Sequence, residues 1–226
     1  MKKPNINVHK KSIYLIVLII LGTALAISAV SCDDKAKEVS GDADILTGDN
    51  KSVDYVHGIP MDENAGVVTE SVADIYTSPD VKSGRITQAL YNQPVRVLQS
   101  ENGWAKVRAV DGSVGWMKEK FIDKNVSSIY GRSYSHKIIV TSRYKEIYSS
   151  LSGGTTIIEA PMGTELLSFN TSGDASEVYL PGNQTGWIKG SGIIHLKPNE
   201  PIPVTNAEDF AATALRLKGA PFMING

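Results

Sequence analysis

Residues 111–117, with the sequence Asp-Gly-Ser-Val-Gly-Trp-Met, contain the pattern that decides the fold of this chain. Asp-Gly is a strong signal for a tight hairpin turn, and the residues after it are of the kind that form strands. A second stretch, Gly-Asn-Gln-Thr-Gly-Trp-Ile at 182–188, again places a glycine directly before a tryptophan. The pattern predicts one β-type folding unit that occurs twice.

Each of these stretches has a matching partner upstream. Ala-Asp-Ile-Tyr-Thr-Ser occupies 73–78 and Lys-Glu-Ile-Tyr-Ser-Ser occupies 145–150. Corresponding residues of the two copies lie about 70 positions apart, and a fixed period of this kind indicates a repeated domain. The chain has 226 residues with 20 glycines and 10 prolines, which favours two small, turn-rich β domains.

Short β-type segments follow one another through both units. In the first unit they lie at 72–77, 87–91, 94–98, 104–110 and 114–117, and in the second at 137–141, 145–148, 155–159, 164–169, 176–180 and 186–188. Strands this short suit small barrels better than an open sheet, because closure removes exposed edges. We therefore expect a mainly β fold with two small barrels in tandem.

The charge and the rarer residues exclude several functions. The formal net charge is −1, but without the first 31 residues 19 basic residues stand against 24 acidic ones, which gives −5 and argues against nucleic acid as the partner. The single cysteine rules out an internal disulfide. The four histidines show no metal-ligand spacing, so we expect no metal site: His9, His57, His136 and His195. We expect no other cofactor either.

The first 31 residues read as a secretory signal. Residues 1–11 are basic, residues 13–31 carry no charge, and small residues precede Cys32. The alternative is a membrane-spanning anchor, because the run approaches the ~20 residues that a bilayer needs. The pattern resembles a bacterial lipoprotein signal, and this resemblance implies that Cys32 is lipidated and becomes the new N-terminus. Both alternatives hold the protein to a membrane on the non-cytoplasmic side.

The two ends of the β region look different from its centre. Residues 32–63 are acidic and polar, which is typical of a flexible tether.

Three prolines between residues 198 and 203 indicate a linker, and a short helix is predicted after it. Thr205 and Glu208 form a capping-box pattern. The apolar residues of this helix fall on one face, and glycine and proline then end it: Phe210, Ala214, Leu217, Gly219 and Pro221.

Trp104 is the first candidate for ligand binding. Alternation along its strand places Ala105 and Val107 on the core face and Trp104 on the other face with Lys106 and Arg108. We expect Trp104 at the surface, where an exposed indole beside two cations offers a ligand platform. The alternative is that Trp104 caps the rim of the barrel or packs on the neighbouring domain.

The aromatic residues that both units share are expected to have structural roles. Trp116 and Trp187 occur in both copies, each after a glycine, so we place them in or against the core. Tyr76 and Tyr148 are also shared, and they could belong to the core or line a groove. Tyr76 is kept as a candidate ligand-binding residue.

Several segments resemble a bacterial SH3 domain. These are Val-Ala-Asp-Ile-Tyr-Thr-Ser-Pro at 72–79, Thr-Gln-Ala-Leu-Tyr at 87–91, Pro-Val-Arg-Val-Leu at 94–98, Asn-Gly-Trp-Ala-Lys-Val-Arg at 102–108 and Asp-Gly-Ser-Val-Gly-Trp at 111–116. The second unit resembles a diverged copy. The resemblance implies SH3 domains at 64–125 and 126–197, that is, two small SH3-like barrels in tandem followed by a short C-terminal helix.

Residues 211–226 resemble the opening of an NlpC/P60-type cell-wall peptidase domain. The family pattern Gly-x-Pro-Tyr-x-Trp-Gly-Gly reads Gly-Ala-Pro-Phe-Met-Ile-Asn-Gly at 219–226. Tandem SH3 domains before such a peptidase are the layout of γ-D-glutamyl-L-diamino acid endopeptidases. The resemblance implies that 198–226 hold a linker and the truncated start of a papain-like domain, before its catalytic cysteine. Cys32 lies in the signal, so we expect no catalytic residue and no hydrolysis by this chain alone.

The resemblance also points to two positions for substrate recognition. In the family, an acidic residue after Thr-Gln-x-Leu-Tyr-Gly and a tyrosine in Asp-Gly-Tyr-x-Gly-Trp hold the amino end of the stem peptide. These positions are Gln93 and Ser113 here, and Asn92 replaces the glycine. Both remain candidate ligand-binding residues, although the acid and the phenol are missing.

Two hypotheses for the function follow. In the first, the chain is an envelope lipoprotein and the N-terminal portion of a peptidoglycan-directed cysteine endopeptidase, where its SH3 domains bind or position stem peptides. In the second, it is a complete, non-catalytic SH3 module that binds the cell wall or a protein partner. Both predict peptidoglycan or wall-derived peptides as partners, contact with a membrane through a lipid anchor, and a location facing the periplasm or the cell exterior.

Overall fold

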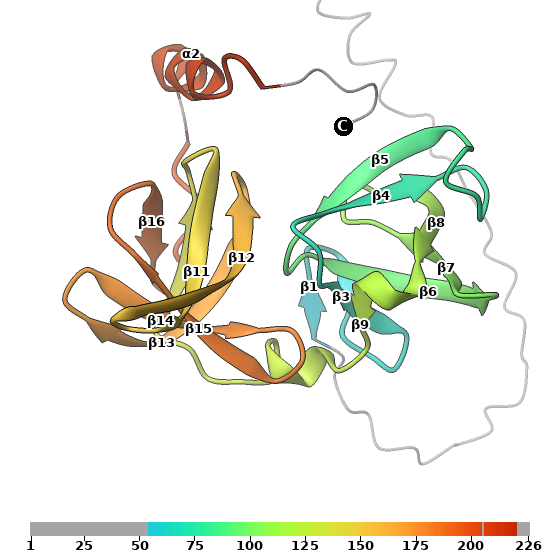
Figure 1. The fold of residues 1–226 in the computed structure, drawn as a ribbon, viewed down its shortest axis with the longest axis horizontal. Coiled ribbons are helices and arrows are strands. Elements are labelled where there is room, and N and C mark those ends of the chain that lie inside the picture. Colours follow the sequence, from blue (N-terminus) through green and yellow to red (C-terminus); the bar gives the residue numbers. More distant parts are fainter. Residues whose placement is uncertain (1–53, 205, 221–226) are drawn as a thin grey trace, which may run out of the picture. The chain divides into compact units, whose positions relative to one another are not determined.

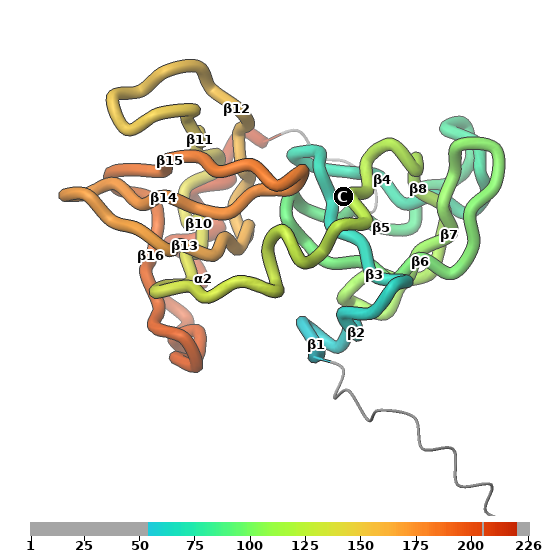
Figure 2. Tube along the Cα trace, turned by 90° about the horizontal axis from the view of Figure 1, so that it is seen from below, coloured from blue at the N-terminus to red at the C-terminus, as the bar shows by residue number. Residues whose placement is uncertain are grey.

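The fold is mainly β, as expected. The structure is a computed structural model that describes residues 54–204 and 206–220. It contains two antiparallel seven-stranded sheets, a two-stranded hairpin and one α-helix (Figure 1). The predictions for the signal, for Cys32 and for most of the tether lie outside the described residues. Figure 2 shows that each sheet is built from its own part of the chain, cyan to green for the first and yellow to orange for the second.

The first sheet has the strand order β5-β4-β8-β7-β6-β3-β9. Its strands are β3 (Ala65–Val68), β4 (Val72–Tyr76), β5 (Arg85–Leu90), β6 (Pro94–Glu101), β7 (Trp104–Arg108), β8 (Val114–Lys118) and β9 (Ile122–Asp123), with the 3-10 turn η1 (Glu119–Phe121) before β9. The five predicted strands are present with boundary shifts of one to three residues. β3 and β9 were not predicted because neither shows an alternation of apolar and polar residues. All four residues of β3 are buried, and β9 has only two residues.

The second sheet repeats this order strand for strand, as β12-β11-β15-β14-β13-β10-β16. The 3-10 turn η2 (Val126–Ser128) precedes it. Its strands are β10 (His136–Val140), β11 (Tyr144–Ser150), β12 (Gly153–Pro161), β13 (Glu165–Ser172), β14 (Ala175–Leu180), β15 (Gln184–Lys189) and β16 (Ile193–Leu196). The prediction of one unit that occurs twice is therefore confirmed at the level of topology. Among the described residues no pairing joins the two ends of either sheet, so the sheets are not the closed barrels that the sequence suggested.

Two tight turns set the register of the central strands. Asn102 and Gly103, between β6 and β7, have φ values of 50° and 77°, which is the left-handed conformation that an Asn-Gly hairpin turn requires. Between β7 and β8, Gly112 has a φ of 85°, and the Asp111 side chain accepts a 2.8 Å hydrogen bond from the Ser113 N–H. The turn that the Asp-Gly signal predicted is therefore present.

The glycine before each shared tryptophan faces inward at a close approach. A Cβ on Gly115 would lie 2.5 Å from the Tyr76 carbonyl oxygen, and one on Gly186 would lie 2.6 Å from Ile147 Cγ2. Since strand residues alternate between faces, Trp116 and Trp187 point away from the core and are half-buried. Their expected place in or against the core was wrong.

Small and medium apolar side chains fill both cores. The first core contains Val68, Ala73, Ile75, Ala89, Val95, Ala105, Val107, Ala109, Met117 and Ile122. The second contains Ile138, Val140, Ile147, Ala160, Leu166, Val178, Leu180 and Ile188, and Tyr91 from the end of β5 joins it. Full burial of one such Val, Leu, Ile or Met side chain stabilises a fold by about 1.5–3 kcal/mol. Ala105 and Val107 are 0% exposed, as the alternation predicted.

A hairpin precedes the first sheet, inside the stretch expected to be a tether. β1 (Tyr55–Val56) and β2 (Ile59–Pro60) pair across His57 and Gly58, whose φ values are 49° and 77°. The hairpin ends are closed by a 2.8 Å hydrogen bond from the Met61 N–H to the Asp54 carbonyl oxygen.

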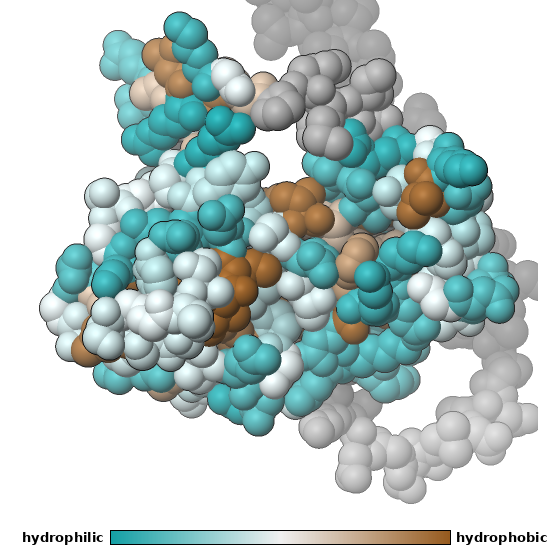
Figure 3. All heavy atoms as spheres, in the orientation of Figure 1, coloured by the Kyte–Doolittle hydropathy of each residue, from teal (hydrophilic) through white to brown (hydrophobic). Residues whose placement is uncertain are grey.

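The predicted helix is present as α2 (Ala207–Arg216). Its capping box uses Asn206 and Asp209, one residue later than expected, and Thr205 lies outside the described residues. α2 buries no residue, and Phe210 is 74% exposed. Figure 3 accordingly shows brown, apolar spheres among teal ones at the position of α2. Within the described ranges, no helix has the length and apolar character needed to cross a membrane.

Candidate functional site

The first sheet gathers aromatic and charged side chains on the face opposite its core. The register places Tyr76 opposite Trp116, Trp116 opposite Lys106, and Trp104 opposite Lys118. Alternation along β4, β7 and β8 turns all of these side chains outward together with Asp74. We call this set the first outer face: Asp74, Tyr76, Trp104, Lys106, Trp116 and Lys118.

Trp104 forms the packed centre of the first outer face. Its ring meets the Tyr76 ring edge-on, with centroids 5.9 Å apart at 85°, and Lys118 Nζ lies 3.7 Å from its centroid. Both are favourable geometries for an indole. With these neighbours over it, Trp104 is only 6% exposed. Alternation predicted the correct face, but the expected surface position was wrong because two long side chains cover the ring.

Asp74 fixes the orientation of Tyr76. Its carboxylate accepts hydrogen bonds from the Tyr76 hydroxyl at 3.0 Å, from Arg85 Nη1 at 3.1 Å and from Gln88 Nε2 at 2.7 Å. Burial acts to raise the pKa of Asp74, but the bonds from Gln88, Tyr76 and Arg85 outweigh it, so the pKa lies below its usual value. Burial and the nearby carboxylate both raise the pKa of Tyr76, which therefore stays a neutral donor.

The first outer face has the chemistry of a binding surface. Tyr76 and Trp116 are half-buried, so each ring keeps part of its area open to solvent, and Lys106 and Lys118 bring two cations beside them. Such a surface suits a ligand with an apolar or flat part and a carboxylate. In residues 54–204 and 206–220, no group of three or more His, Cys, Asp or Glu residues could hold a metal ion.

The structure brings only two of the four candidate ligand-binding residues into contact. Tyr76 and Trp104 touch on the first outer face. Gln93 lies in the turn between β5 and β6, where its Oε1 accepts a 2.9 Å hydrogen bond from the Leu90 N–H. Ser113 lies in the turn between β7 and β8. Both side chains belong to turns, and their ligand role stays a prediction.

Sequence reasoning missed Asp74 and Lys118 on this face. A signal for Asp74 was present, because a carboxylate precedes the shared tyrosine by two residues in both units, as Asp74 before Tyr76 and Glu146 before Tyr148. Two residues is the period of a strand, so carboxylate and phenol lie on one face. No comparable signal marked Lys118, whose position over Trp104 depends on the pairing of β7 with β8.

A network of polar contacts joins the hairpin and the first sheet to the second. Glu165 pairs with His57 Nε2 at 3.1 Å and with Lys137 Nζ at 3.3 Å. The Asn92 side chain donates a 2.8 Å bond to the Glu165 carbonyl oxygen, and the Tyr130 hydroxyl donates one of 2.8 Å to the Asn92 carbonyl oxygen. The Glu165 hydrogen bond raises the pKa of His57, although burial acts in the opposite direction.

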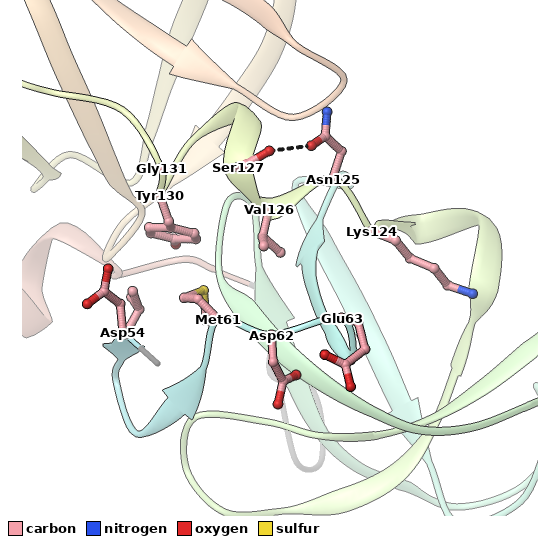
Figure 4. Close-up of a pocket in the computed structure, with 11 residues that line it drawn as sticks. Asp54, Met61, Asp62, Glu63, Lys124, Asn125, Val126, Ser127, Tyr130 and Gly131 are labelled. Atoms are coloured by element: carbon pink, nitrogen blue, oxygen red, sulfur yellow. Dashed lines mark hydrogen bonds between the residues drawn. The ribbon is translucent and has the colours of Figure 1, made fainter. Parts of the chain in front are cut away.

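A cavity of about 510 Å³ lies under the hairpin. Figure 4 shows Met61 and the Tyr130 ring at its border, with Asp62 and Glu63 on the side of the β2–β3 connection. Arg96 Nη1 approaches Asp62 to 2.9 Å, and this bond holds the pKa of Asp62 below its usual value. This carboxylate is therefore engaged in an internal ion pair.

Comparison with known proteins supports a bacterial SH3 fold. Residues 75–122 match the family described as "Bacterial dipeptidyl-peptidase Sh3 domain". An NlpC/P60 family protein from Bacillus cereus ATCC 10987 has the same fold, with a TM-score of 0.63 and 20% identity over 72% of this chain. The chain covers 66% of that protein. The resemblance of the first unit to a bacterial SH3 domain is confirmed, and the mainly β fold is shared with a solved NlpC/P60 family protein.

Two other solved structures overlap with less agreement. NlpC2 from Trichomonas vaginalis is 17% identical, with a TM-score of 0.24, over 69% of this chain and 56% of its own. The CBD of the endolysin LysPBC5 is 16% identical, with a TM-score of 0.22, over 58% of this chain and 92% of its own. No curated protein matches the sequence.

Proposed function

We propose that this chain binds peptidoglycan through its stem peptides and that the first outer face is the binding surface. The observation that carries the proposal is the pair of half-buried rings, Tyr76 and Trp116, with Lys106 and Lys118 beside them. The bacterial SH3 match over residues 75–122 and the fold of an NlpC/P60 protein support a role at the cell wall.

The chemistry of a stem peptide fits this surface. Such a peptide has free carboxylates, a short backbone and small apolar side chains. Lysine ammonium groups attract the carboxylates, while the rigid rings of Tyr76 and Trp116 provide contact area at little entropic cost. The Asp74 carboxylate holds the Tyr76 ring in place by a 3.0 Å hydrogen bond, so this part of the surface is ordered before a ligand arrives.

Co-sedimentation of the full chain with protein-free peptidoglycan sacculi tests the proposal. We expect the variant Lys106→Gln/Trp116→Ala to lose at least about tenfold in affinity, which corresponds to about 1.4 kcal/mol. Lys82→Gln, at an exposed position in the β4–β5 connection, is the matched control and should bind like the wild type. Equal sedimentation of the double variant and the wild type would show that the first outer face is not the binding surface.

We also propose that the chain is anchored in the cell envelope through a lipid on Cys32. The support is the basic, apolar and small-residue pattern that ends at this single cysteine. In cells, Cys32→Ser should accumulate as a larger precursor and leave the membrane fraction. An unchanged mobility and unchanged fractionation of this variant would contradict the anchor.

The finer proposal is that the module positions stem peptides for a γ-D-glutamyl peptidase domain. The similarity of residues 211–226 to the opening of such a domain supports it. The alternative is a binding module that acts without catalysis. Reading the coding region beyond residue 226 distinguishes them: an Asp-Cys-Ser-Gly-like continuation with a later histidine supports the first, and a stop codon supports the second.

A further inference from the structure

The second sheet repeats the first outer face. Tyr148 lies opposite Trp187 as Tyr76 lies opposite Trp116, and the Tyr148 hydroxyl donates a hydrogen bond to Glu146 as that of Tyr76 does to Asp74. Lys189 Nζ lies 5.4 Å from the centroid of the Tyr148 ring. The second outer face therefore consists of Glu146, Tyr148, Glu177, Trp187 and Lys189, with Ala175 at its edge.

One replacement distinguishes the two faces. Ala175 pairs with Lys189 as Trp104 pairs with Lys118, so an alanine stands where the first face has its buried indole. On the first face, Tyr76 and Lys118 both contact Trp104. On the second face their counterparts, Tyr148 and Lys189, instead border a hollow of about 290 Å³, together with Tyr144, Lys145 and Glu146.

The charges in this hollow favour an anionic group. Lys145 and Lys189 contribute two ammonium groups against the single carboxylate of Glu146. Glu146 is already engaged by the hydroxyls of Tyr148 and, at 3.4 Å, Thr156. Among the ion pairs of the described residues, none involves Lys145 or Lys189. Lys145 Nζ donates a 2.6 Å hydrogen bond to the Ser191 carbonyl oxygen, so Lys189 is the ammonium group that can pair with a carboxylate of a ligand on the Tyr148 ring.

We propose that this hollow is a second binding site, specific for a carboxylate-bearing wall peptide. The inference rests on the proposed function, since it assigns a second copy of the same kind of ligand to the second sheet. The ligand lies against Tyr148 and Lys189, whose counterparts contact Trp104 on the first face, and its carboxylate pairs with Lys189. A chain with two such sites binds a polymer that displays many stem peptides more tightly than it binds one soluble peptide, because the second binding event becomes intramolecular.

Backbone NMR of the full chain, titrated with a soluble synthetic γ-D-glutamyl-L-diamino acid peptide, tests the inference. We expect saturable shifts at the amides of Tyr148 and Lys189 as well as at those of Tyr76 and Trp116. Lys189→Gln should weaken binding at the second face about tenfold, since it removes the paired charge and keeps the side-chain length. Ala175→Trp should place an indole against Tyr148 and Lys189, as Trp104 lies against Tyr76 and Lys118, and should abolish the second set of shifts. Lys82→Gln is the control.

The possible outcomes separate the inference from the proposed function. The inference is supported if Lys189→Gln weakens peptide binding at the second face and leaves binding at the first face unchanged. Shifts confined to the first face in the wild type, or an unchanged affinity of Lys189→Gln at the second face, overturn it and leave the proposed function standing. Shifts at neither face overturn both. Shifts confined to the second face keep the inference and remove the first outer face as the binding surface. If Ala175→Trp does not fold, Lys189→Gln alone decides.

Discussion

At the scale of the residue, the face on which a side chain lies and the depth at which it is buried have different causes. Strand alternation decides the face, and it placed Trp104 opposite Ala105 and Val107, as the structure has it. Depth is decided by neighbours from other strands, and here Tyr76 and Lys118 cover the indole. Trp104 and Trp116 therefore exchange the roles expected for them, with Trp104 buried and Trp116 half open.

This exchange predicts the order of two stability losses. Trp104→Ala should lower the free energy of unfolding by about 3 kcal/mol, because it removes a buried ring. Trp116→Ala should cost less, about 1 kcal/mol, because it mainly loses a cross-strand pair on a half-open face. Urea denaturation followed by circular dichroism measures both. A larger loss in Trp116→Ala would show that the indole of Trp104 does not support the face.

Asp74 makes the stability depend on pH in the acid range. Its pKa is lowered in the folded chain, so its contribution is present above the unfolded value of about 3.9 and is lost as the pH falls through the lower folded value. Asp74→Asn has no carboxylate to protonate at this position, so its free energy of unfolding should fall less steeply with decreasing pH below about pH 4. Glu70→Gln, at an exposed position, should keep the wild-type profile. A profile of Asp74→Asn as steep as that of the wild type would contradict the role of this carboxylate.

At the scale of the element, the Gly-Trp pair lets two strands approach closely. Gly115 of β8 faces the backbone of β4, and a Cβ there would meet the Tyr76 carbonyl oxygen at 2.5 Å. A Cβ on the equivalent Gly186 of β15 would meet only side-chain atoms at close range, the nearest being Ile147 Cγ2 at 2.6 Å. A side chain can rotate, whereas a paired backbone carbonyl moves only with its strand. The glycine requirement is therefore stricter in the first sheet.

Gly115→Ala should thus lower the free energy of unfolding by about 2 kcal/mol, as expected for overpacking. Gly186→Ala should cost less, because Ile147 and Leu180 can adjust their rotamers. Gly84→Ala is the matched control: its φ is not positive and its Cβ would lie 3.7 Å from Thr77 Cγ2, an ordinary contact, so its stability should stay near that of the wild type. Thermal unfolding of the three variants in parallel checks the order, and a Gly115→Ala protein as stable as Gly84→Ala would refute the steric argument.

At the scale of the whole molecule, the two sheets share side chains. Tyr91 is 4% exposed and belongs to the core of the second sheet, although it follows β5 of the first. Val67 of β3 packs with Ile129 and Leu167 in a third cluster. The side chain of Asn92 adds its bond to the Glu165 carbonyl oxygen. Because of these contacts, we expect residues 65–196 to unfold as one unit rather than as two independent domains.

Tyr91→Ala should therefore uncouple the sheets. The variant loses a buried aromatic ring, at a cost of about 3–5 kcal/mol, and most of the loss should fall on the second sheet, which holds the ring in its core. We expect one unfolding transition in the wild type and two in the variant, seen by calorimetry. Tyr55→Ala, whose residue is 69% exposed, should keep a single transition. A single, merely shifted transition in Tyr91→Ala would mean that the other contacts suffice for coupling.

The sequence alone was enough for the features that depend on local chemistry. Turn residues such as Asn102 and Gly112 and the period-two alternation of β4, β7 and β8 act over a few residues, so the predicted strands and the duplication of the unit were found. β3, β9 and β16 were missed because they are short or lack alternation, and only pairing with distant strands makes them visible.

Only the tertiary structure decided how the candidate site is assembled. The cover of Tyr76 and Lys118 over Trp104, the hollow between Tyr148 and Lys189, and the entry of Tyr91 into the second core each join residues far apart in the chain. Such contacts follow from strand order and register, which arise from the packing of the whole sheet. The residues next to each other in the sequence do not determine that packing. The depth of burial and the position of cavities can therefore be known only from the assembled sheets.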